Sequence, residues 1–211
     1  MIRESAFERW QRICGMVARF DLAQLRYSLW VRFKGLDFSG ESCESLGIPE
    51  ERASSHAHSG GPHLERVLDA IGVAPGSQAM DFGSGKGIAT ITLSRYFDSV
   101  TGVEMSPKLV EISKRNVAKL GLKNIQFICG DAGKVREGLE EVTHVYMFNP
   151  FPAVVMEEVM NNLRLSLQSS SRKLVIIYKN PICHDTVLRA GFAQRQQFAF
   201  RYTHPFVIYS N

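Results

Sequence analysis

The sequence predicts an α/β fold built on a mostly parallel, doubly wound sheet. From residue 76 onward, short apolar runs alternate with segments of helical periodicity, which implies parallel strands joined by right-handed crossovers. A glycine-rich turn at residues 83–87 follows the first of these strands, where the backbone can approach a ligand closely. Two further expected strands, residues 192–201 and 206–209, are joined by a short turn and predict an antiparallel hairpin.

Length and composition limit the number of domains and the compartment. With 211 residues and 45% apolar content, the chain can bury one sizeable core, so we expect one domain with a small addition. The net charge of +4 permits an acidic partner without requiring one. No apolar run approaches about 18 residues, the usual minimum for crossing a bilayer. Four cysteines without a C-x-x-C pair predict a reduced, cytoplasmic protein without a structural metal: Cys14, Cys43, Cys129 and Cys183.

An N-terminal helical extension precedes the domain. Apolar residues recur at helical spacing between residues 5 and 34 and predict two amphipathic helices that break near Phe20-Asp21. Residues 1–37 carry seven Lys and Arg against four acids, a net of +3, so these weakly basic helices hold most of the surplus charge. We expect a cap whose apolar face packs on the domain. The alternatives are a platform for an acidic substrate or nucleic acid and a helix on a membrane surface.

A loop or connector rich in Gly, Ser and Glu follows at residues 35–62. Its histidines, His56 and His58, and the nearby His63 have no cysteine or carboxylate at metal-ligand spacing. We therefore expect solvated histidines and no metal site.

The domain contains a regular series of strands and helices. Ser106 as N-cap, Pro107 at the first position and Gly121 as the stop delimit one helix clearly. A nearly continuous apolar strand at residues 172–178 is typical of a strand covered on both faces. The expected strands are residues 99–104, 124–129, 145–148 and 172–178, and the expected helices are residues 62–70, 107–120, 153–168 and 185–190.

The stretch from Met80 to Gly87, MDFGSGKG, predicts a strand end, a tight turn and the start of a helix. Glycines accept positive φ, and the helix behind them presents free N–H groups and the positive end of its dipole. Asp81 can accept hydrogen bonds from the turn or from a ligand ammonium. A dinucleotide fingerprint is excluded because its third glycine falls at Ile88, and a P-loop is excluded because Gly87 follows Lys86. The pattern that remains is D-x-G-x-G-x-G.

This turn and three later strand ends resemble, in order, the motifs of class I S-adenosylmethionine-dependent methyltransferases. The strand ends are Val103-Glu104, Gly130-Asp131-Ala132 and Asn149-Pro150-Phe151-Pro152, and the resemblance covers residues 64 to 180. It implies a Rossmann-like sheet of seven strands with S-adenosyl-L-methionine as the cofactor. It also implies that residues 1–62 are a helical cap with a lid or connector, and that residues 63–211 are the methyltransferase domain.

The resemblance implies a role for each cofactor motif. Glu104 would accept both ribose hydroxyls, because a planar carboxylate suits two neighbouring donors. Asp131 would accept the exocyclic amine of adenine, and the glycine turn would approach the methionine part. The cofactor-binding residues implied in this way are Asp81, Phe82, Gly83, Ser84, Gly85, Gly87, Glu104, Met105, Asp131, Ala132 and Asn149.

The segment Asn149-Pro150-Phe151-Pro152 is similar to the Asn/Asp-Pro-Pro-Tyr/Phe motif of enzymes that methylate amide or base nitrogens. In those enzymes the Asn orients the amine and the aromatic ring packs on the acceptor. The resemblance therefore implies an N-methyltransferase with Asn149, Pro150 and Phe151 as catalytic residues. In this sequence the aromatic residue and the second proline are exchanged, and the Asn-then-Phe order also resembles non-SET histone-lysine methyltransferases. The alternative is a structural turn with Phe151 in the core.

The identity of the methyl acceptor stays open at this point. Transfer from a sulfonium needs a nucleophile held in line at roughly 3 to 3.5 Å, and it needs a general base only when the acceptor arrives protonated. A protein side chain, a base, a small amine or an oxygen acceptor all satisfy this. A non-catalytic cofactor-binding or interaction module is the competing hypothesis. Lys86 either contacts the cofactor carboxylate or is solvated, and Lys179 ends a strand at the edge where such folds bind substrates.

Overall fold

The computed structural model describes residues 22–40, 46, 52, 60–201 and 203–211. The chain forms two compact units, residues 1–36 and 37–211, which we describe separately. In the first unit, helix α2 (Leu22–Phe33) has no buried residue. The helix expected before it lies outside the described residues, so the cap and platform functions stay predictions.

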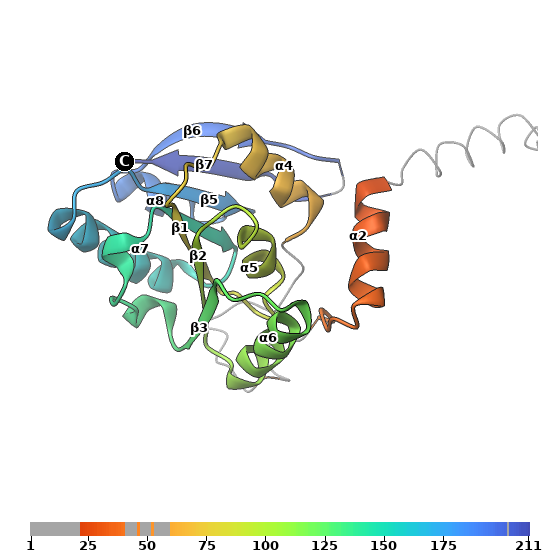
Figure 1. Ribbon diagram of the computed structural model, residues 1–211. Coiled ribbons are helices and arrows are strands. Elements are labelled where there is room, and N and C mark those ends of the chain that lie inside the picture. Colours follow the sequence, from red (N-terminus) through yellow and green to blue (C-terminus); the bar gives the residue numbers. More distant parts are fainter. Residues whose placement is uncertain (1–21, 41–45, 47–51, 53–59, 202) are drawn as a thin grey trace, which may run out of the picture. The chain divides into compact units, whose positions relative to one another are not determined.

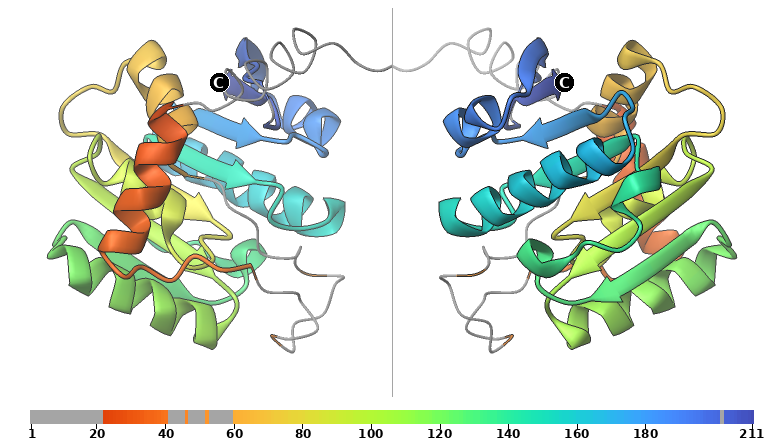
Figure 2. Two further views of the ribbon diagram at one scale, coloured as in Figure 1. Left: turned by 90° about the vertical axis from the view of Figure 1, so that its right-hand side faces the viewer. Right: turned by 90° about the vertical axis from the view of Figure 1, so that its left-hand side faces the viewer.

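The second unit is built on a sheet of seven strands in the order β3-β2-β1-β4-β5-β7-β6. The first five strands of this order run parallel, whereas β7 pairs antiparallel with both β5 and β6. Figures 1 and 2 show the C-terminal hairpin (blue) at one end of the sheet and β3 (green) at the other. The predicted fold class is therefore confirmed. The strands are β1 (Gln78–Phe82), β2 (Ser99–Glu104), β3 (Ile125–Cys129), β4 (His144–Phe148), β5 (Val175–Lys179), β6 (Ala193–Phe198) and β7 (Phe206–Ser210).

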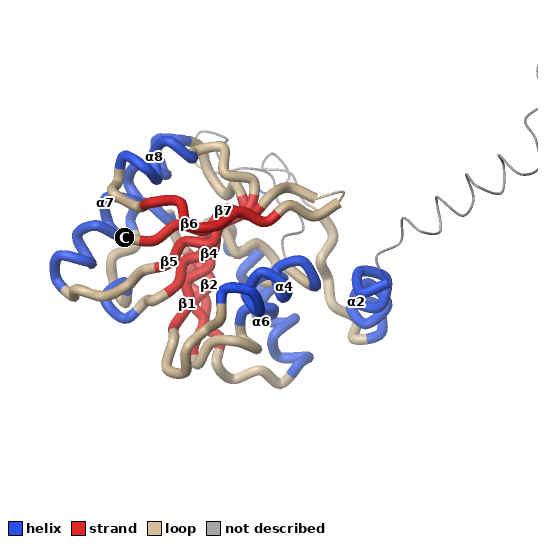
Figure 3. The backbone as a smooth tube through the Cα atoms, turned by 90° about the horizontal axis from the view of Figure 1, so that it is seen from above, coloured by secondary structure: helices blue, strands red, loops and turns tan. Residues whose placement is uncertain are grey.

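Helices cover both faces of this sheet, as Figure 3 shows from above. One face carries α4 (Pro62–Ile71), α5 (Ile88–Leu93) and α6 (Pro107–Leu120), and the other carries α7 (Ala153–Ser169) and α8 (His184–Arg189). Two 3-10 helices, η1 (Ala132–Lys134) and η2 (Leu139–Glu141), connect β3 to β4. Among the described residues, no helix is both long and apolar enough to cross a membrane.

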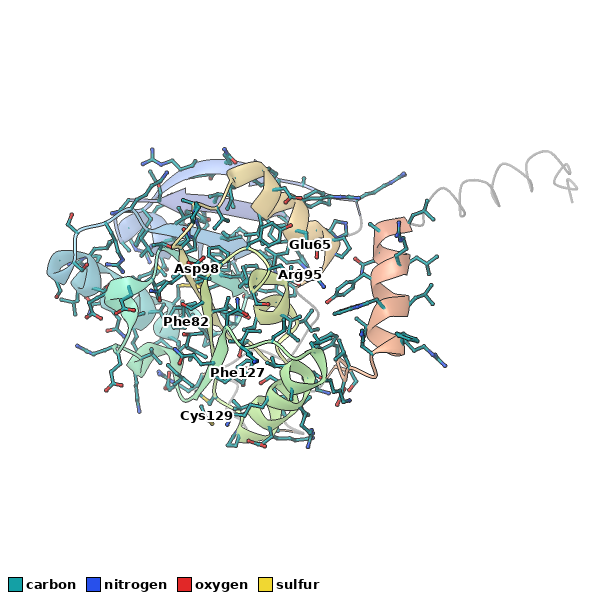
Figure 4. All side chains as sticks on the ribbon, in the orientation of Figure 1. Glu65, Phe82, Arg95, Asp98, Phe127 and Cys129 are labelled. Atoms are coloured by element: carbon teal, nitrogen blue, oxygen red, sulfur yellow. The ribbon has the colours of Figure 1, made fainter. Side chains whose placement is uncertain are left out.

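The core consists of two clusters, because successive residues of each strand point to opposite faces. Tyr146 and Ile177 pack with α4 and α5, whereas Val145 and Ile176 pack with α7 and α8. Phe82, labelled in Figure 4, belongs to the cluster on the α7 face. Burial on both faces explains the continuous apolar strands.

An ion pair joins two helices on the α4 face. Arg95 donates to Glu65 at 2.7 Å and so links the end of α5 to α4, and both side chains are labelled in Figure 4. The predicted helix start at Pro62 is confirmed. His63 packs its ring on Phe200, with ring centroids 5.0 Å apart, while His56 and His58 lie outside the described residues.

Capping of α6 follows the prediction closely. The Ser106 hydroxyl accepts from the Leu109 N–H, Pro107 occupies the first turn, and Gly121 ends the helix with a left-handed φ of 66°. Here the local sequence alone determines both ends of the element.

The start of β5 differs from the prediction. The strand begins at Val175, whereas we expect it at Arg172 from the apolar run. The Arg172 guanidinium donates to the carbonyls of Val142 at 2.7 Å and Ser170 at 2.8 Å, and these bonds hold the connection out of the ladder. The bond to Val142 joins segments 30 residues apart and leaves no local signal.

Candidate cofactor and acceptor site

The glycine turn lies between the carboxyl ends of β1 and β2. Gly83, Gly85 and Gly87 all have left-handed φ values, of 76°, 56° and 85°. The N–H groups of Gly83 and Ser84 donate to the carbonyl of Val103 at 2.9 and 3.0 Å. These bonds fix the turn to β2, so the backbone is already arranged to approach a ligand.

Asp81 is a buried carboxyl at the end of β1. The Thr90 hydroxyl of α5 donates to it at 2.6 Å. Burial and the nearby Glu104 raise the pKa of Asp81 to about 7, although the hydrogen bonds from Thr90 oppose this rise. Near neutral pH this carboxyl therefore changes charge readily.

Glu104 closes the turn from the end of β2. Its Oε2 accepts from the Gly85 N–H and its Oε1 accepts from the Ser106 N–H, both at 2.9 Å. Burial raises its pKa, and the backbone donors oppose that effect. Each carboxylate oxygen keeps a second lone pair, so the carboxylate can accept two further donors side by side. This donor requirement fits the two hydroxyls of a ribose.

Side chains behind the turn leave room only for glycine. A Cβ on Gly102 of β2 would lie 2.7 Å from the Phe127 ring and 2.9 Å from the Ser84 hydroxyl oxygen. Phe127 is labelled in Figure 4, next to Cys129 of the same strand.

The buried Ser84 hydroxyl has no hydrogen-bond partner among the residues that the structure describes. A glycine cradle with an unsatisfied hydroxyl fits a polar ligand. The sequence analysis missed Gly102, because a single glycine within a strand is a weak signal.

Lys86 is buried inside the turn, so of the two alternatives for this residue the solvated lysine is wrong. Its Nζ lies 3.0 Å from an Asp37 carboxylate oxygen and 2.7 Å from the Ser39 hydroxyl. Asn116 of α6 bonds the backbone of Asp37 at both its N–H and its carbonyl. Although burial alone would raise it, the bonds from Lys86 and Ser39 lower the pKa of Asp37 to about 2. The segment after residue 36 is thus part of the turn's support.

Asp131 begins η1 after β3, at the position expected for the adenine amine. Its Oδ1 accepts from the Gly133 N–H at 2.9 Å, and its Oδ2 accepts from the Arg52 guanidinium at 3.1 Å. Arg52 also donates to Glu158 of α7 at 2.7 Å, which lowers the pKa of Glu158. A residue of the expected connector therefore contacts the expected adenine acid. Arg52 was missed because one arginine in a connector carries no signal.

The predicted acceptor segment follows β4 and touches the glycine turn. Asn149 has an uncommon left-handed φ of 40°. A Cβ on Gly83 would lie only 2.3 Å from the Pro150 Cβ, so these two residues are in close contact. Phe151 is 4% exposed and packs in the core cluster on the α7 face, as in the structural alternative. Its ring therefore has little exposed surface for stacking on an acceptor.

A cavity of about 550 Å³ adjoins this segment. Asn149 and Phe151 line one side of it, and Asp185, Thr186 and Arg189 of α8 line the other. The cavity has both charge signs and borders Asn149, which the resemblance assigns to orienting the acceptor.

A row of three side chains crosses the carboxyl edge of β4, β5 and the neighbouring end of β7. Phe148 pairs in register with Lys179, and Lys179 pairs with Phe206. The Lys179 Nζ lies 4.3 Å from the centroid of the Phe148 ring and 5.5 Å from that of Phe206. Lys179 is 6% exposed, and burial lowers its pKa to about 8.

The contact between Gly83 and Pro150 gives a direct test of how the two halves of the site meet. We expect Gly83→Ala to weaken S-adenosylmethionine binding by about 30-fold, because its Cβ overlaps Pro150 and displaces the turn. The matched control is Gly76→Ala, since Gly76 has a similar φ of 79° and no atom within 4 Å of an added Cβ. Titration calorimetry measures both affinities. If both variants lose affinity equally, the effect comes from backbone strain and not from the contact with Pro150.

Comparisons with known proteins agree with this arrangement. Residues 46–146 match the family model of protein-L-isoaspartate(D-aspartate) O-methyltransferase. The protein-L-isoaspartate O-methyltransferase of Thermotoga maritima is 37% identical over 67 residues, which cover 30% of this chain and 21% of that protein. The Pyrococcus abyssi protein of the same name is 28% identical over 142 residues, which cover 61% of this chain and 62% of that protein.

Solved structures show the same fold at low sequence identity. A SAM-dependent methyltransferase from Aquifex aeolicus has a TM-score of 0.56 and 19% identity, and the match covers 69% of this chain and 88% of that one.

The family match includes the cofactor half of the site but not the predicted acceptor segment. The chain spans less than two thirds of the length of the curated relatives it matches. The family match includes the glycine turn, Glu104 and Asp131 but ends before Asn149. The sheet order, the order of the motifs and the sequence matches agree on the cofactor half. The chain therefore has the fold of class I methyltransferases, and its cofactor half is similar to the protein-L-isoaspartate O-methyltransferases.

Proposed function

We propose that this protein transfers the methyl group of S-adenosylmethionine to a carboxylate oxygen of a protein or peptide, forming a methyl ester. The observation that best supports methyl transfer is the contact between Gly83 and Pro150, which joins the cofactor turn to the acceptor segment. Donor and acceptor must lie in line at roughly 3 to 3.5 Å, and two adjoining segments suit that requirement.

The residues of the cofactor half have separate roles in this proposal. Glu104 accepts the ribose hydroxyls, Asp131 accepts the adenine amine, and Asp81 receives the ammonium of the methionine part. The glycine turn with Phe82, Ser84 and Met105 supplies the wall of this site. The bound cofactor supplies a methyl group already activated on a sulfonium.

Two observations favour a carboxylate acceptor. The relatives with the family match are named as O-methyltransferases of protein isoaspartate, which is a carboxyl acceptor. The largely buried Phe151 offers little ring surface for the planar amide or base that the nitrogen motif requires. A carboxylate is also deprotonated near neutral pH, so its methylation requires no general base.

A nitrogen acceptor is the second candidate, and Asn149 favours it. Its side chain lines the cavity, and its left-handed backbone places an amide directly after β4. In this alternative the amide oxygen of Asn149 orients the N–H groups of an amine.

The chemistry of the product distinguishes the two acceptors. The protein is incubated with methyl-labelled S-adenosylmethionine and peptides of one sequence that carry isoaspartate, aspartate or lysine at one position. Methyl esters release methanol in mild base, whereas N-methyl groups do not. Base-labile label on a carboxylate peptide supports the proposal, and base-stable label on the lysine peptide supports the nitrogen candidate. If the protein binds the cofactor but labels neither the carboxylate peptides nor the lysine peptide, both candidate acceptors are contradicted.

Asn149→Gly tests the acceptor side, because glycine removes the amide and keeps the left-handed φ. We expect turnover to fall about 100-fold through misplacement of the acceptor, while cofactor affinity changes less than about twofold. Steady-state kinetics and calorimetry measure the two effects. If cofactor affinity falls as much as turnover, Asn149 belongs to the cofactor site instead.

A further inference from the structure

We propose that the Lys179 ammonium, held between the Phe148 and Phe206 rings, binds the acceptor's carboxylate and makes the enzyme select anionic acceptors. This inference rests on the proposed function and names the residue that recognises the substrate. The family match ends before this residue, and no comparison assigns it a role.

The position of Lys179 follows from the register of three strands. Phe148, Lys179 and Phe206 pair directly across β4, β5 and β7, so their side chains share one face of the sheet. This row lies at the carboxyl edge, where open α/β sheets bind their ligands. Phe148 directly precedes Asn149, whose neighbour Pro150 touches the glycine turn. The row therefore adjoins the segment where donor and acceptor are expected to meet.

The two rings hold the ammonium in place. Distances of 4.3 and 5.5 Å from Nζ to the ring centroids are within the range of cation–π attraction. The aromatic wall continues beyond the row, since Phe200 packs on Phe206 with centroids 6.0 Å apart. His204 packs on Phe148 at 5.7 Å, and His63 of α4 packs on Phe200 at 5.0 Å.

Burial makes this cation selective for an anion. Lys179 as a residue is only 6% exposed, and a charge pair formed at such a buried site is screened far less than one in water. A carboxylate gains a charge-assisted hydrogen bond from Lys179, whereas a protonated amine meets a like charge. Its lowered pKa of about 8 still leaves Lys179 mostly charged at pH 7. The residue thus discriminates between the two acceptor classes considered above.

The test measures binding apart from chemistry. Calorimetry titrates the protein, with and without S-adenosylhomocysteine, with two peptides of one sequence, one carrying isoaspartate and the other its carboxamide. We expect the wild type to bind the carboxylate peptide at least about tenfold more tightly, a charged hydrogen bond's contribution. Lys179→Met should abolish this preference. Lys173→Met is the matched control, because Lys173 is exposed and lies just before the same strand, and it should keep the preference.

The pH dependence of the binding preference is a second measurement, and a purely structural role of Lys179 would not affect it. The preference of the wild type should decline above pH 8 as Lys179 loses its proton, whereas Lys179→Met should show no preference at any pH. Because His63 and His204 are present in both proteins, the difference between the profiles isolates Lys179. Thermal unfolding confirms that each variant is folded.

Two results would overturn the inference: equal binding of both peptides by the wild type, or a preference that survives Lys179→Met. Failure to bind S-adenosylhomocysteine counts against the proposed function instead. A Lys179-dependent preference in that case would still support this inference.

Discussion

Glu104→Gln is expected to weaken S-adenosylmethionine binding by about 100-fold or more, the largest effect of any single substitution in the cofactor half. The Glu104 carboxylate already accepts from the Gly85 and Ser106 N–H groups, one on each oxygen. A glutamine replaces one of these oxygens with an NH₂ group, which faces a backbone donor and offers no lone pair to a ribose hydroxyl. The substitution therefore disturbs the turn and removes half of the ribose site.

Calorimetric titration with S-adenosylmethionine and S-adenosylhomocysteine at pH 7.5 measures this loss, and circular dichroism checks the fold. The control is Glu111→Gln, an exposed glutamate of α6 whose carboxylate lies 3.6 Å from the Lys114 Nζ. The control should bind like the wild type. If Glu104→Gln keeps its affinity within about threefold, Glu104 does not hold the ribose.

Asp81→Asn is expected to remove most of the decline of stability with rising pH between about pH 4 and pH 7. The pKa of Asp81 is raised from 3.8 to about 7, so the folded protein keeps a proton that the unfolded chain releases. Stability from this group is present below the unfolded pKa and declines as the pH rises from about 4 to about 7. Above pH 7 the ionised carboxylate costs on the order of 4 kcal/mol, the equivalent of about three pKa units. Asparagine removes this cost and still accepts from Thr90.

Urea unfolding at pH 5, 6, 7 and 8 tests this prediction. We expect the free energy of unfolding of the variant to vary less with pH and to exceed that of the wild type at pH 8. Cofactor affinity should fall, because asparagine gives the cofactor ammonium no opposite charge. A destabilisation of equal size at every pH would show that Asp81 is not a protonated buried carboxyl.

The sequence predicts the parts of the site that depend on local chemistry. The glycine turn has its own backbone requirement, and the helix after β2 has its own cap and stop, so residues 80–87 and 106–121 fold as expected. The mostly parallel sheet with an antiparallel end follows from regular alternation and the final hairpin. Each of these signals lies within one short segment.

The remaining features depend on contacts between segments far apart in the chain. The pairs Lys86–Asp37 and Arg52–Asp131 join the connector to the motifs, and no local pattern identifies either pair. The direction of the Phe151 ring depends on the packing of α7 and α8. Lys179 becomes conspicuous only when β7 inserts beside β5 and brings Phe206 against it.

The nitrogen prediction rested on a segment where sequence similarity is least informative. Four residues after a strand resemble an acceptor motif, but their order is altered and the family match stops before them. Phe151 packs in the core, so the similarity of the sequence to the acceptor motif does not extend to the position of the aromatic ring.

The ion pair between Lys86 and Asp37 limits where the chain can be truncated without damage to the glycine turn. Asp37 is 49% exposed, yet it is the carboxylate partner of an ammonium that is only 1% exposed. A truncation that starts at Asp37 keeps this pair, whereas one that starts a few residues later removes the Asp37 carboxylate from a buried charge. Weak activity in the shorter fragment would then reflect a damaged glycine turn rather than the loss of residues 1–36. Fragments designed to assign a role to residues 1–36 should therefore retain Asp37 and Ser39.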